Sequence, residues 1–269
     1  MTASAPTAIV AIPIHTTCLS ADGRMALMRA VRVLGRHPMA ILCPEGLDLA
    51  PLQPLFGAIQ PRVERFDPAF FDGIAGYNRL MLSEVLYERF IHYDYLLVCQ
   101  TDAYVFSDQL QAWCARGYDW IGAPWIGSPR NVWSRAQLRI RNLFRRRKKY
   151  DDYLFKVGNG GFSLRRVATF LRIVREQRDD IAHRLAHPDD RDLHVEDRYF
   201  SQIAPALYPD MRIPSYEEAV AFCMDRRPHL AMAMNGGRLP FACHGFDKRN
   251  VRAFWEPILQ RSQQEPAAA

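Results

Sequence analysis

The sequence contains no stretch of about 18 apolar residues, the length that a membrane-spanning helix needs. Its first residues carry no basic segment, and Pro13 and His15 interrupt the early apolar run. Secretory signals have a basic segment followed by an uninterrupted apolar run, so we expect a cytoplasmic protein. No internal repeat or linker-like segment divides the chain. We therefore predict one domain over residues 1–262, with a disordered tail at 263–269.

Paired cysteine motifs and phosphate-binding loop signatures are also missing. The six cysteines are scattered, without a C-x-x-C pair, and several lie in apolar runs, as Cys43 and Cys99 do. This pattern indicates buried thiols in a reducing compartment and argues against a zinc site. Neither GxxxxGK[ST] nor GxGxxG occurs, which argues against a P-loop and against the dinucleotide-binding fingerprint.

The positive charge is concentrated in one segment. The net charge is +6, and seven basic residues lie between Arg139 and Lys149. Such a run fits either a solvated surface loop or a site for phosphates, anionic lipids or nucleic acid. Interleaved apolar residues such as Trp133 and Phe144 favour peripheral contact with the inner face of a membrane. We expect no nucleic acid partner, because no known RNA or DNA motif accompanies the run.

Strand and helix patterns alternate through the first half of the chain. Apolar runs at 7–15, 39–44 and 94–102 predict buried strands, and 62–67 predicts another. Helices are expected after Ser20 or Asp22, with a stop at Gly35, and at 77–90. This order predicts an α/β fold with a mainly parallel central sheet and helices on both faces. Ligands of such sheets bind beyond the carboxyl ends of the strands, which here places His15, Thr16, Gln100 and Asp102 at the candidate site.

Asp102 and the glycine-rich segment that follows it in the sequence each have both a chemical and a structural interpretation. Asp102 follows an apolar strand directly and fits either a ligand for a divalent cation on a diphosphate or a cap of the next turn. The segment Val157–Arg166 contains Gly158, Asn159, Gly160 and Gly161, and predicts a turn before a helix. Glycines of this kind let the backbone approach a ligand closely.

Acidic residues and a histidine follow later. Glu196 and Asp197 start a predicted helix, where acids are favoured by the helix dipole, and an acid there could equally be a general base. His244 lies beside Gly245 after an apolar stretch and fits a metal ligand or a structural histidine. Trp120 and Trp125 fit either core packing or stacking on an acceptor sugar.

Taken together, the blocks resemble a known family. YDYLLVCQTDAYVF, WCARGYDWIGAPW, VGNGGFSLRRV, VEDRYF and FACHGF look like a family of mostly uncharacterised GT-A-type glycosyltransferase-like proteins. The matching blocks span roughly residues 75–250. The resemblance implies a GT-A-like (Rossmann-like) domain, with a nucleotide-binding half at about 7–110 and an acceptor and catalytic half at about 111–262. It also implies occurrence in bacteria and fungi, often near polysaccharide genes.

The resemblance also implies roles for particular residues. Asn78, Arg79, Gln100, Asp102, Asn159, Gly160 and Gly161, with His15 and Thr16, would bind the nucleotide sugar. Asp197 would be the base and Glu196 would bind the acceptor, while Asp102 and His244 would hold Mn²⁺ or Mg²⁺. One departure from the family pattern weakens the predicted metal binding. Gln100, which carries no charge, stands where the usual Asp-x-Asp motif has its first acid.

The sequence therefore predicts an inverting hexosyltransferase-like enzyme of polysaccharide biosynthesis. Its donor would be a nucleotide-diphosphate sugar, and its acceptor a glycan or lipid-linked glycan. Three other functions stay open: a nucleotidyltransferase, a catalytically inactive module that binds nucleotide sugars or glycans, and a nucleic-acid-binding protein. The last is suggested by the basic run alone, and the missing RNA or DNA motif argues against it.

Overall fold

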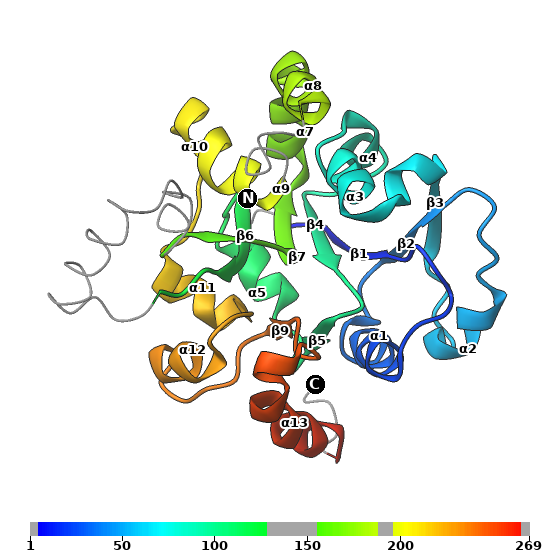
Figure 1. Cartoon of the computed structure of the whole chain (residues 1–269), viewed down its shortest axis with the longest axis vertical. Coiled ribbons are helices and arrows are strands. Elements are labelled where there is room, and N and C mark those ends of the chain that lie inside the picture. The colour runs from blue at the N-terminus through cyan, green and yellow to red at the C-terminus, as the bar shows by residue number, and fades with distance from the viewer. Residues whose placement is uncertain (1–4, 128–154, 188–195, 265–269) are drawn as a thin grey trace, which may run out of the picture.

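The computed structural model describes residues 5–127, 155–187 and 196–264 (Figure 1). The basic segment Arg139–Lys149 lies outside the described residues. The elements of the first part are β1 (Ala8–Pro13), α1 (Ala21–Leu34), β2 (Met39–Pro44), η1 (Ala50–Leu52), α2 (Gln53–Phe56), β3 (Arg62–Phe66), η2 (Pro68–Phe71), α3 (Gly73–Met81), α4 (Glu84–Glu88), β4 (Tyr95–Cys99), β5 (Ala103–Val105), α5 (Leu110–Ala115) and β6 (Trp120–Pro124). The others are β7 (Val157–Arg166), α7 (Val167–Glu176), α8 (Arg178–Ala186), α9 (Glu196–Arg198), the π-helical turn η4 (Tyr199–Ile203), α10 (Ala204–Leu207), α11 (Tyr216–Phe222), β8 (Cys223–Met224), α12 (Pro228–Met234), β9 (Ala242–His244) and α13 (Arg249–Gln264).

A six-stranded sheet forms the centre, in the order β3-β2-β1-β4-β7-β6. The strands β1 to β4 run parallel, while β7 is antiparallel to both of its neighbours. Every residue of β4 is buried, and so is every residue of β1 and β2 except the last. Strands covered on both faces have continuous apolar sequences, which is why the runs at 7–15, 39–44 and 94–102 predicted them. The predicted α/β class with a mostly parallel sheet is confirmed.

Helices cover both faces of this sheet. In Figure 1, α3, α4, α7 and α9 lie on one side of the strands, and α1 and α5 lie on the other. The helix α1 begins where predicted, because the Ser20 side chain accepts a hydrogen bond from the Gly23 amide, and it ends at Gly35. Of the described helices, none is both long and apolar enough to cross a lipid bilayer.

Three predicted elements differ from the structure. The helix expected at 77–90 is two helices, because the Ser83 hydroxyl accepts from the Leu86 amide and starts α4 anew. The glycine-rich segment is not a turn but the long strand β7, paired with both β4 and β6. The helix α13 continues to Gln264, two residues into the segment expected to be a disordered tail.

A second, three-stranded sheet has the order β5-β9-β8 and lies beyond the carboxyl end of β4. It is formed by short strands far apart in the sequence: β5 pairs antiparallel with β9, and β8 pairs parallel with β9. All of its residues are buried. This small sheet joins the C-terminal part of the chain to the end of the central sheet.

Candidate functional site

The register of the small sheet brings three ionisable residues together. Ala103 pairs with His244, so Asp102, directly before β5, lies beside His244. Met224 pairs with Cys243, so Asp225, directly after β8, lies on the other side of the same histidine. His244 Nε2 is 3.1 Å from Asp102 Oδ1, and its Nδ1 is 3.8 Å from Asp225 Oδ1. The imidazole is therefore held between two carboxylates.

These neighbours set the charges of the site. Burial opposes a charge on His244, but the facing carboxylates of Asp102 and Asp225 outweigh it and raise the pKa of the imidazole to about 9. Burial also works against ionisation of the two acids. Even so, His244 and the nearby Lys248 ammonium hold the pKa of Asp102 and of Asp225 below the ordinary value. The three residues are thus a charged triad at neutral pH, with Lys248 Nζ 3.9 Å from Asp225 Oδ1.

The end of β4 and the start of β7 complete this cluster. The Gln100 amide nitrogen of the backbone donates to the Gly161 carbonyl at 2.9 Å, and the Gln100 side-chain Oε1 lies 3.2 Å from His244 Nε2. Asn159 bridges the two sheets, since its Nδ2 donates to Asp225 Oδ2 and its Oδ1 accepts from the Gly161 amide, both at 3.0 Å. Gln100, Asp102, Asn159, Gly161 and His244 therefore form one network, which brings together residues that the sequence analysis assigned to the donor and to the metal.

The glycines of β7 are needed for close approach, not for a turn. A Cβ at Gly161 would lie 2.0 Å from His244 Nε2, and a Cβ at Gly160 would lie 2.1 Å from Glu196 Oε1. Ordinary Cβ contacts are more than 3 Å long, so a side chain at either position would displace a predicted site residue. Two consecutive glycines thus let the strand pass between the histidine and the acidic pair.

This close approach makes a testable prediction. Replacing Gly161 with Ala is expected to push the imidazole away from Asp102 and Gln100. The pKa of His244 then falls from about 9 toward the ordinary value of about 6.5. Titration of the histidine resonances by NMR measures it. Gly160→Ala is the matched control, because its Cβ meets Glu196 instead. An unchanged pKa of His244 in Gly161→Ala would contradict the packing described here.

The acidic pair lies beyond these glycines and is linked to a buried arginine. Arg165 Nη2 donates to Glu196 Oε1 at 3.0 Å, with both side chains almost fully buried. Burial raises the pKa of Glu196 against the opposing charge of Arg165. Burial first, and then the neighbouring Glu196 carboxylate, raise the pKa of Asp197 to about 7. Glu196 Oε2 and Asp197 Oδ1 are buried without a hydrogen-bond partner among the described residues.

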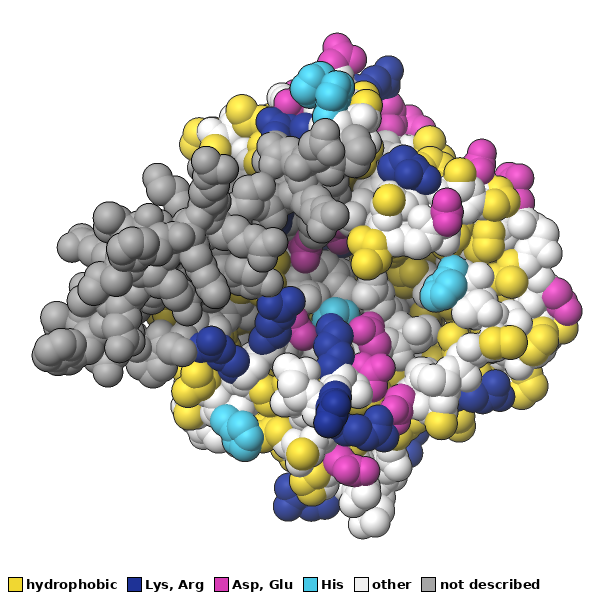
Figure 2. All heavy atoms as spheres, viewed as in Figure 1, with side chains coloured by type: hydrophobic (Ala, Val, Ile, Leu, Met, Phe, Trp, Pro, Cys, Tyr) yellow, Lys and Arg dark blue, Asp and Glu magenta, His cyan; other side chains and the backbone are white. Residues whose placement is uncertain are grey.

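A pocket of about 410 Å³ opens beside this network at the carboxyl ends of β1 and β4. In Figure 2, acidic, basic and histidine side chains gather around a hollow in the middle of the face, near the ends of β5, β7 and β9. The pocket combines polar strand ends with apolar groups from η2 and α3, a composition suited to a ligand with both a charged and a flat apolar part. It is lined by Pro13, His15, Phe71, Gly73, Ile74, Tyr77, Gln100, Thr101 and Asp102.

The geometry also allows a test of the predicted divalent cation. Asp102 Oδ1 and Gln100 Oε1 lie 3.1 and 3.2 Å from His244 Nε2, the spacing of neighbouring ligands around one ion with bonds of about 2.1 Å. The described residues contain no group of three His, Cys, Asp or Glu side chains suited to a metal. These donors therefore fit a cation only if a ligand such as a diphosphate supplies the remaining oxygens.

Four other predicted residues divide between the site and its surroundings. Asn78 is at the site, since its Oδ1 accepts from the Glu196 amide at 3.4 Å. Arg79 instead donates to the Ala69 carbonyl and does not line the pocket. Thr16 accepts from the Cys18 amide, next to the lining residue His15. Trp125 is half-buried, and its ring covers Gly158.

The acceptor role expected for Trp120 is wrong. Its side chain has no exposed surface and stacks on Phe170 with ring centroids 5.5 Å apart. The Arg165 guanidinium carbon lies over the Trp120 ring, 5.1 Å from the ring centre. Trp120 belongs to a strand buried on both faces, so core packing outweighs the resemblance of its sequence block.

Sequence reasoning missed four residues of this region: Tyr77, Arg165, Asp225 and Lys248. Asp225 carried the same signal as Asp102, an acid directly after an apolar run, FCM. Lys248 follows His244 by four residues in a block that was already identified. Arg165 had no signal, because a charged residue in a strand usually points to solvent, whereas this one is fully buried.

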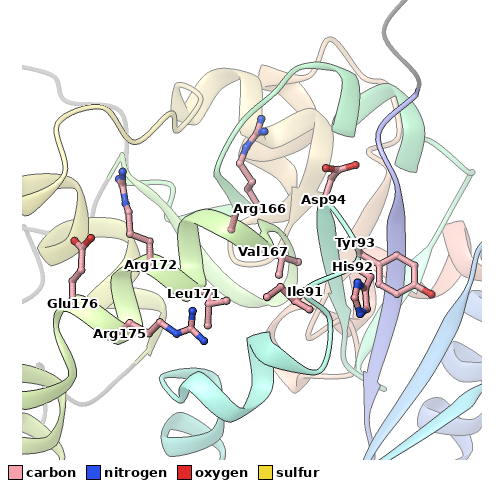
Figure 3. A pocket seen from close by; sticks show the side chains of 11 residues that line it. Ile91, His92, Tyr93, Asp94, Arg166, Val167, Leu171, Arg172, Arg175 and Glu176 are labelled. Atoms are coloured by element: carbon pink, nitrogen blue, oxygen red, sulfur yellow. The ribbon is translucent and has the colours of Figure 1, made fainter.

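A second hollow, of about 540 Å³, lies at the opposite edge of the central sheet, where β4 begins and β7 ends (Figure 3). Its arginines are paired with acids: Arg175 with Glu84 and Glu88, Arg172 with Asp210, and Arg166 with Asp119. None of the predicted site residues lines it. Its cations are thus largely neutralised, and the candidate site is the network at the carboxyl edge.

Comparison with known proteins agrees with this topology. The structure is similar to that of mouse xyloside xylosyltransferase 1 in its apo form, with 12% identity and a TM-score of 0.50, over 91% of this chain and 98% of that one. It is also similar to an active-site mutant of LgtC, with 14% identity and a TM-score of 0.55, over 95% of each chain.

Sequence comparison adds the family. No curated protein matches the sequence. The profile described as "Protein of unknown function (DUF5672)" matches residues 60–244. This range contains the whole network and Asp225, but not Lys248. The chain belongs to the DUF5672 family, and its fold is that of the GT-A glycosyltransferases.

Proposed function

We propose that this protein is a glycosyltransferase that moves a sugar from a nucleotide-diphosphate donor to a glycan or lipid-linked glycan. The observation that carries the proposal is the convergence of Gln100, Asp102, Asn159, Glu196 and His244 beside one pocket at the carboxyl edge of the sheet. In open α/β sheets this edge is where ligands bind. The fold shared with known glycosyltransferases supports the same assignment.

The nucleotide would enter the pocket beside His15, with its diphosphate toward Asp102 and His244. The imidazolium of His244 and the ammonium of Lys248 supply positive charge there, and the Gln100 side-chain amide can donate to a phosphate oxygen. A divalent cation held by Asp102, Gln100 and His244 would neutralise charge on the departing nucleotide. His244 can bind the cation only as the neutral imidazole, so the cation would replace the imidazole proton. Because Lys248 supplies positive charge at this point without the cation, we expect the cation to strengthen binding and not to be its sole source.

Asp197 is the proposed general base. The acceptor hydroxyl would lose its proton to the Asp197 carboxylate while its oxygen attacks the anomeric carbon, and the bond from that carbon to the diphosphate oxygen would break with inversion. The pKa of about 7 suits this role, because the carboxylate is then both available and basic at neutral pH. Glu196, fixed by Arg165, would orient the acceptor.

The acceptor side of the proposal rests on Trp125 and on the sequence. The Trp125 ring is half-buried over Gly158, where an exposed part can pack against the C–H face of a sugar. The basic segment Arg139–Lys149, which motivates a lipid-linked acceptor at a membrane surface, lies outside the described residues. A role in polysaccharide biosynthesis follows from the family resemblance alone.

Binding of nucleotide sugars tests the function. A ligand that binds only the native state raises the melting temperature, so UDP-, GDP-, CMP- and dTDP-sugars are screened with and without Mn²⁺. We expect one nucleotide class to raise the melting temperature by several degrees, a further rise with Mn²⁺, and loss of the shift in Asp102→Ala. Asp210→Ala, a change at an exposed acid, is the control. No shift with any donor would contradict the proposal. Binding without sugar transfer in a product assay would indicate the inactive module instead.

A further inference from the structure

The hydroxyl of Tyr77 is a polar group at the site to which no role has yet been given. Tyr77 lies on α3 and lines the pocket on the same wall as Gln100 and Asp102. Its hydroxyl oxygen is buried and has no hydrogen-bond partner among the described residues. A buried hydroxyl without a partner lowers stability, so its presence in a pocket wall calls for a reason other than folding.

Glu196 presents a second unpartnered atom close by. Its Oε1 accepts from Arg165, but its Oε2 is buried without a partner in the described part of the chain. The side chain is only 4% exposed, and Arg165 fixes its orientation. A carboxylate oxygen can only accept hydrogen bonds when ionised, whereas a phenol has a proton to donate.

The backbone places these two groups side by side. Asn78, the residue after Tyr77, accepts from the Glu196 amide and joins the start of α9 to α3. Burial first, and then the nearby Glu196 carboxylate, raise the pKa of the Tyr77 phenol, so the phenol keeps its proton. The charge of Arg165 and the side chain of Gln100, the polar neighbour of the hydroxyl across the pocket, act in the opposite direction. Neither the Tyr77 hydroxyl nor Glu196 Oε2 has a partner in hydrogen-bond geometry among the described residues. Gln100 is the polar neighbour of the hydroxyl and also lines the pocket, so a ligand there would compete with Gln100 for the Tyr77 proton.

We infer that Tyr77 and Glu196 together bind one hydroxyl of the transferred sugar. The Tyr77 hydroxyl would donate a hydrogen bond to the sugar oxygen, and Glu196 Oε2 would accept a hydrogen bond from the sugar hydroxyl. The inference rests on the proposed function, makes Tyr77 a residue that selects the sugar, and gives Glu196 Oε2 a contact with the donor sugar in place of the acceptor contact proposed above. A sugar hydroxyl both accepts and donates, so it complements this pair. A phosphate oxygen would satisfy Tyr77 but would repel the Glu196 carboxylate. A donor sugar without that hydroxyl would leave both groups buried and unpaired, which discriminates strongly against it.

The test uses Tyr77→Phe, which removes only the hydroxyl. The probes are the nucleotide sugar that gives the largest thermal shift with the wild type and the matching nucleoside diphosphate without sugar. We expect the affinity for the nucleotide sugar to fall about 5- to 10-fold, as for the loss of one hydrogen bond. The affinity for the nucleoside diphosphate stays unchanged. Without ligand, the variant melts at the same temperature as the wild type or higher, because an unpartnered buried hydroxyl has been removed.

Tyr199→Phe is the matched control. The Tyr199 hydroxyl is also buried without a partner among the described residues, but Asp180 and Arg184 are its charged neighbours and it does not line the pocket. This control should match the wild type in affinity for both probes. Equal loss of affinity for both probes in Tyr77→Phe would assign Tyr77 to the phosphates and overturn the inference.

Deoxy donors provide a second measurement. In a series of donors that each lack one ring hydroxyl, one analogue should bind the wild type and Tyr77→Phe equally well, because the contact is already gone. If every analogue loses affinity in the variant as the parent donor does, the inference is wrong. Wild-type protein that binds none of the nucleotide sugars overturns the proposed function as well. Donor binding with unaltered affinity in Tyr77→Phe overturns only the role of Tyr77.

Discussion

Replacing Asp197 with Asn is expected to lower the rate of sugar transfer by about 10²- to 10⁴-fold, the usual contribution of a general base. The amide has nearly the shape of the carboxylate but cannot take the acceptor proton. Donor binding should be unchanged, because the diphosphate is proposed to lie at Asp102 and His244 instead. Product formation under saturating donor and acceptor measures the rate, and the thermal shift with donor measures binding.

The pH dependence of the wild type gives an independent test of the same assignment. With its pKa raised to about 7, Asp197 is protonated below pH 7 and ionised above it. The rate under limiting acceptor should therefore rise as the pH passes through about 7, and not near pH 4, where an ordinary Asp titrates. A flat profile between pH 5 and 8 would show that another group accepts the proton.

Asp210→Asn is the control for both measurements. Its side chain is 69% exposed and pairs with Arg172 away from the pocket, so transfer and its pH profile should match those of the wild type. Turnover at the wild-type rate in Asp197→Asn would reject the base assignment while leaving the donor site intact. Loss of donor binding in that variant would place Asp197 among the donor contacts instead.

The parallel strands β1, β2 and β4 of the central sheet could be predicted because the apolar residues of each strand are consecutive in the sequence. In β1, β2 and β4 nearly every residue is buried, so each strand is an unbroken apolar run that few other structures permit. The prediction of one helix at 77–90 was wrong because of a single capping side chain. Ser83 offers the backbone a hydrogen bond that competes with helix continuation, and apolar periodicity alone does not reveal such a break.

The glycine-rich segment was misinterpreted because the reason for its glycines is not local. Glycine most often marks a turn, and the sequence near Gly160 and Gly161 gives no other explanation. The structure supplies one: the missing Cβ atoms leave room for Glu196 and His244, which lie 36 and 83 residues further along the chain. The resemblance assigned both glycines to the donor site, and the structure places them next to two other predicted site residues, Glu196 and His244.

The missed residues have a similar cause. Asp225 joins the site only through the pairing of β8 with β9, and Tyr77 only through the contact of α3 with α9. Neither pairing is encoded near the residue itself. Conversely, Trp120 was assigned to the acceptor site because tryptophan occurs both in hydrophobic cores and in sugar-binding sites. Only its burial in β6 shows that it belongs to the core. Strand ends were thus predictable, whereas contacts between distant elements were not.

Arg165→Met is expected to destabilise the protein by about 3–5 kcal/mol, the usual result of removing one partner of a buried ion pair. The Glu196 carboxylate would remain buried without a compensating charge. The Tyr87 hydroxyl, which lies 3.0 Å from Arg165 Nη1, would also lose a partner. For a chain of this size the loss corresponds to a fall of about 10 °C in the melting temperature. Denaturant unfolding at neutral pH measures the free energy directly.

A double-mutant cycle separates this ion pair from simple loss of packing. Adding Glu196→Gln to Arg165→Met removes the uncompensated charge, so the double variant should be more stable than Arg165→Met alone by at least about 1–2 kcal/mol. The guanidinium also packs over the rings of Trp120 and Phe170, a contribution that Met largely preserves. If Glu196→Gln restores nothing, the instability comes from packing, and Glu196 does not need Arg165 to stay ionised. Restored stability without restored sugar transfer would instead show that the ion pair of Arg165 and Glu196 contributes to transfer and not to stability.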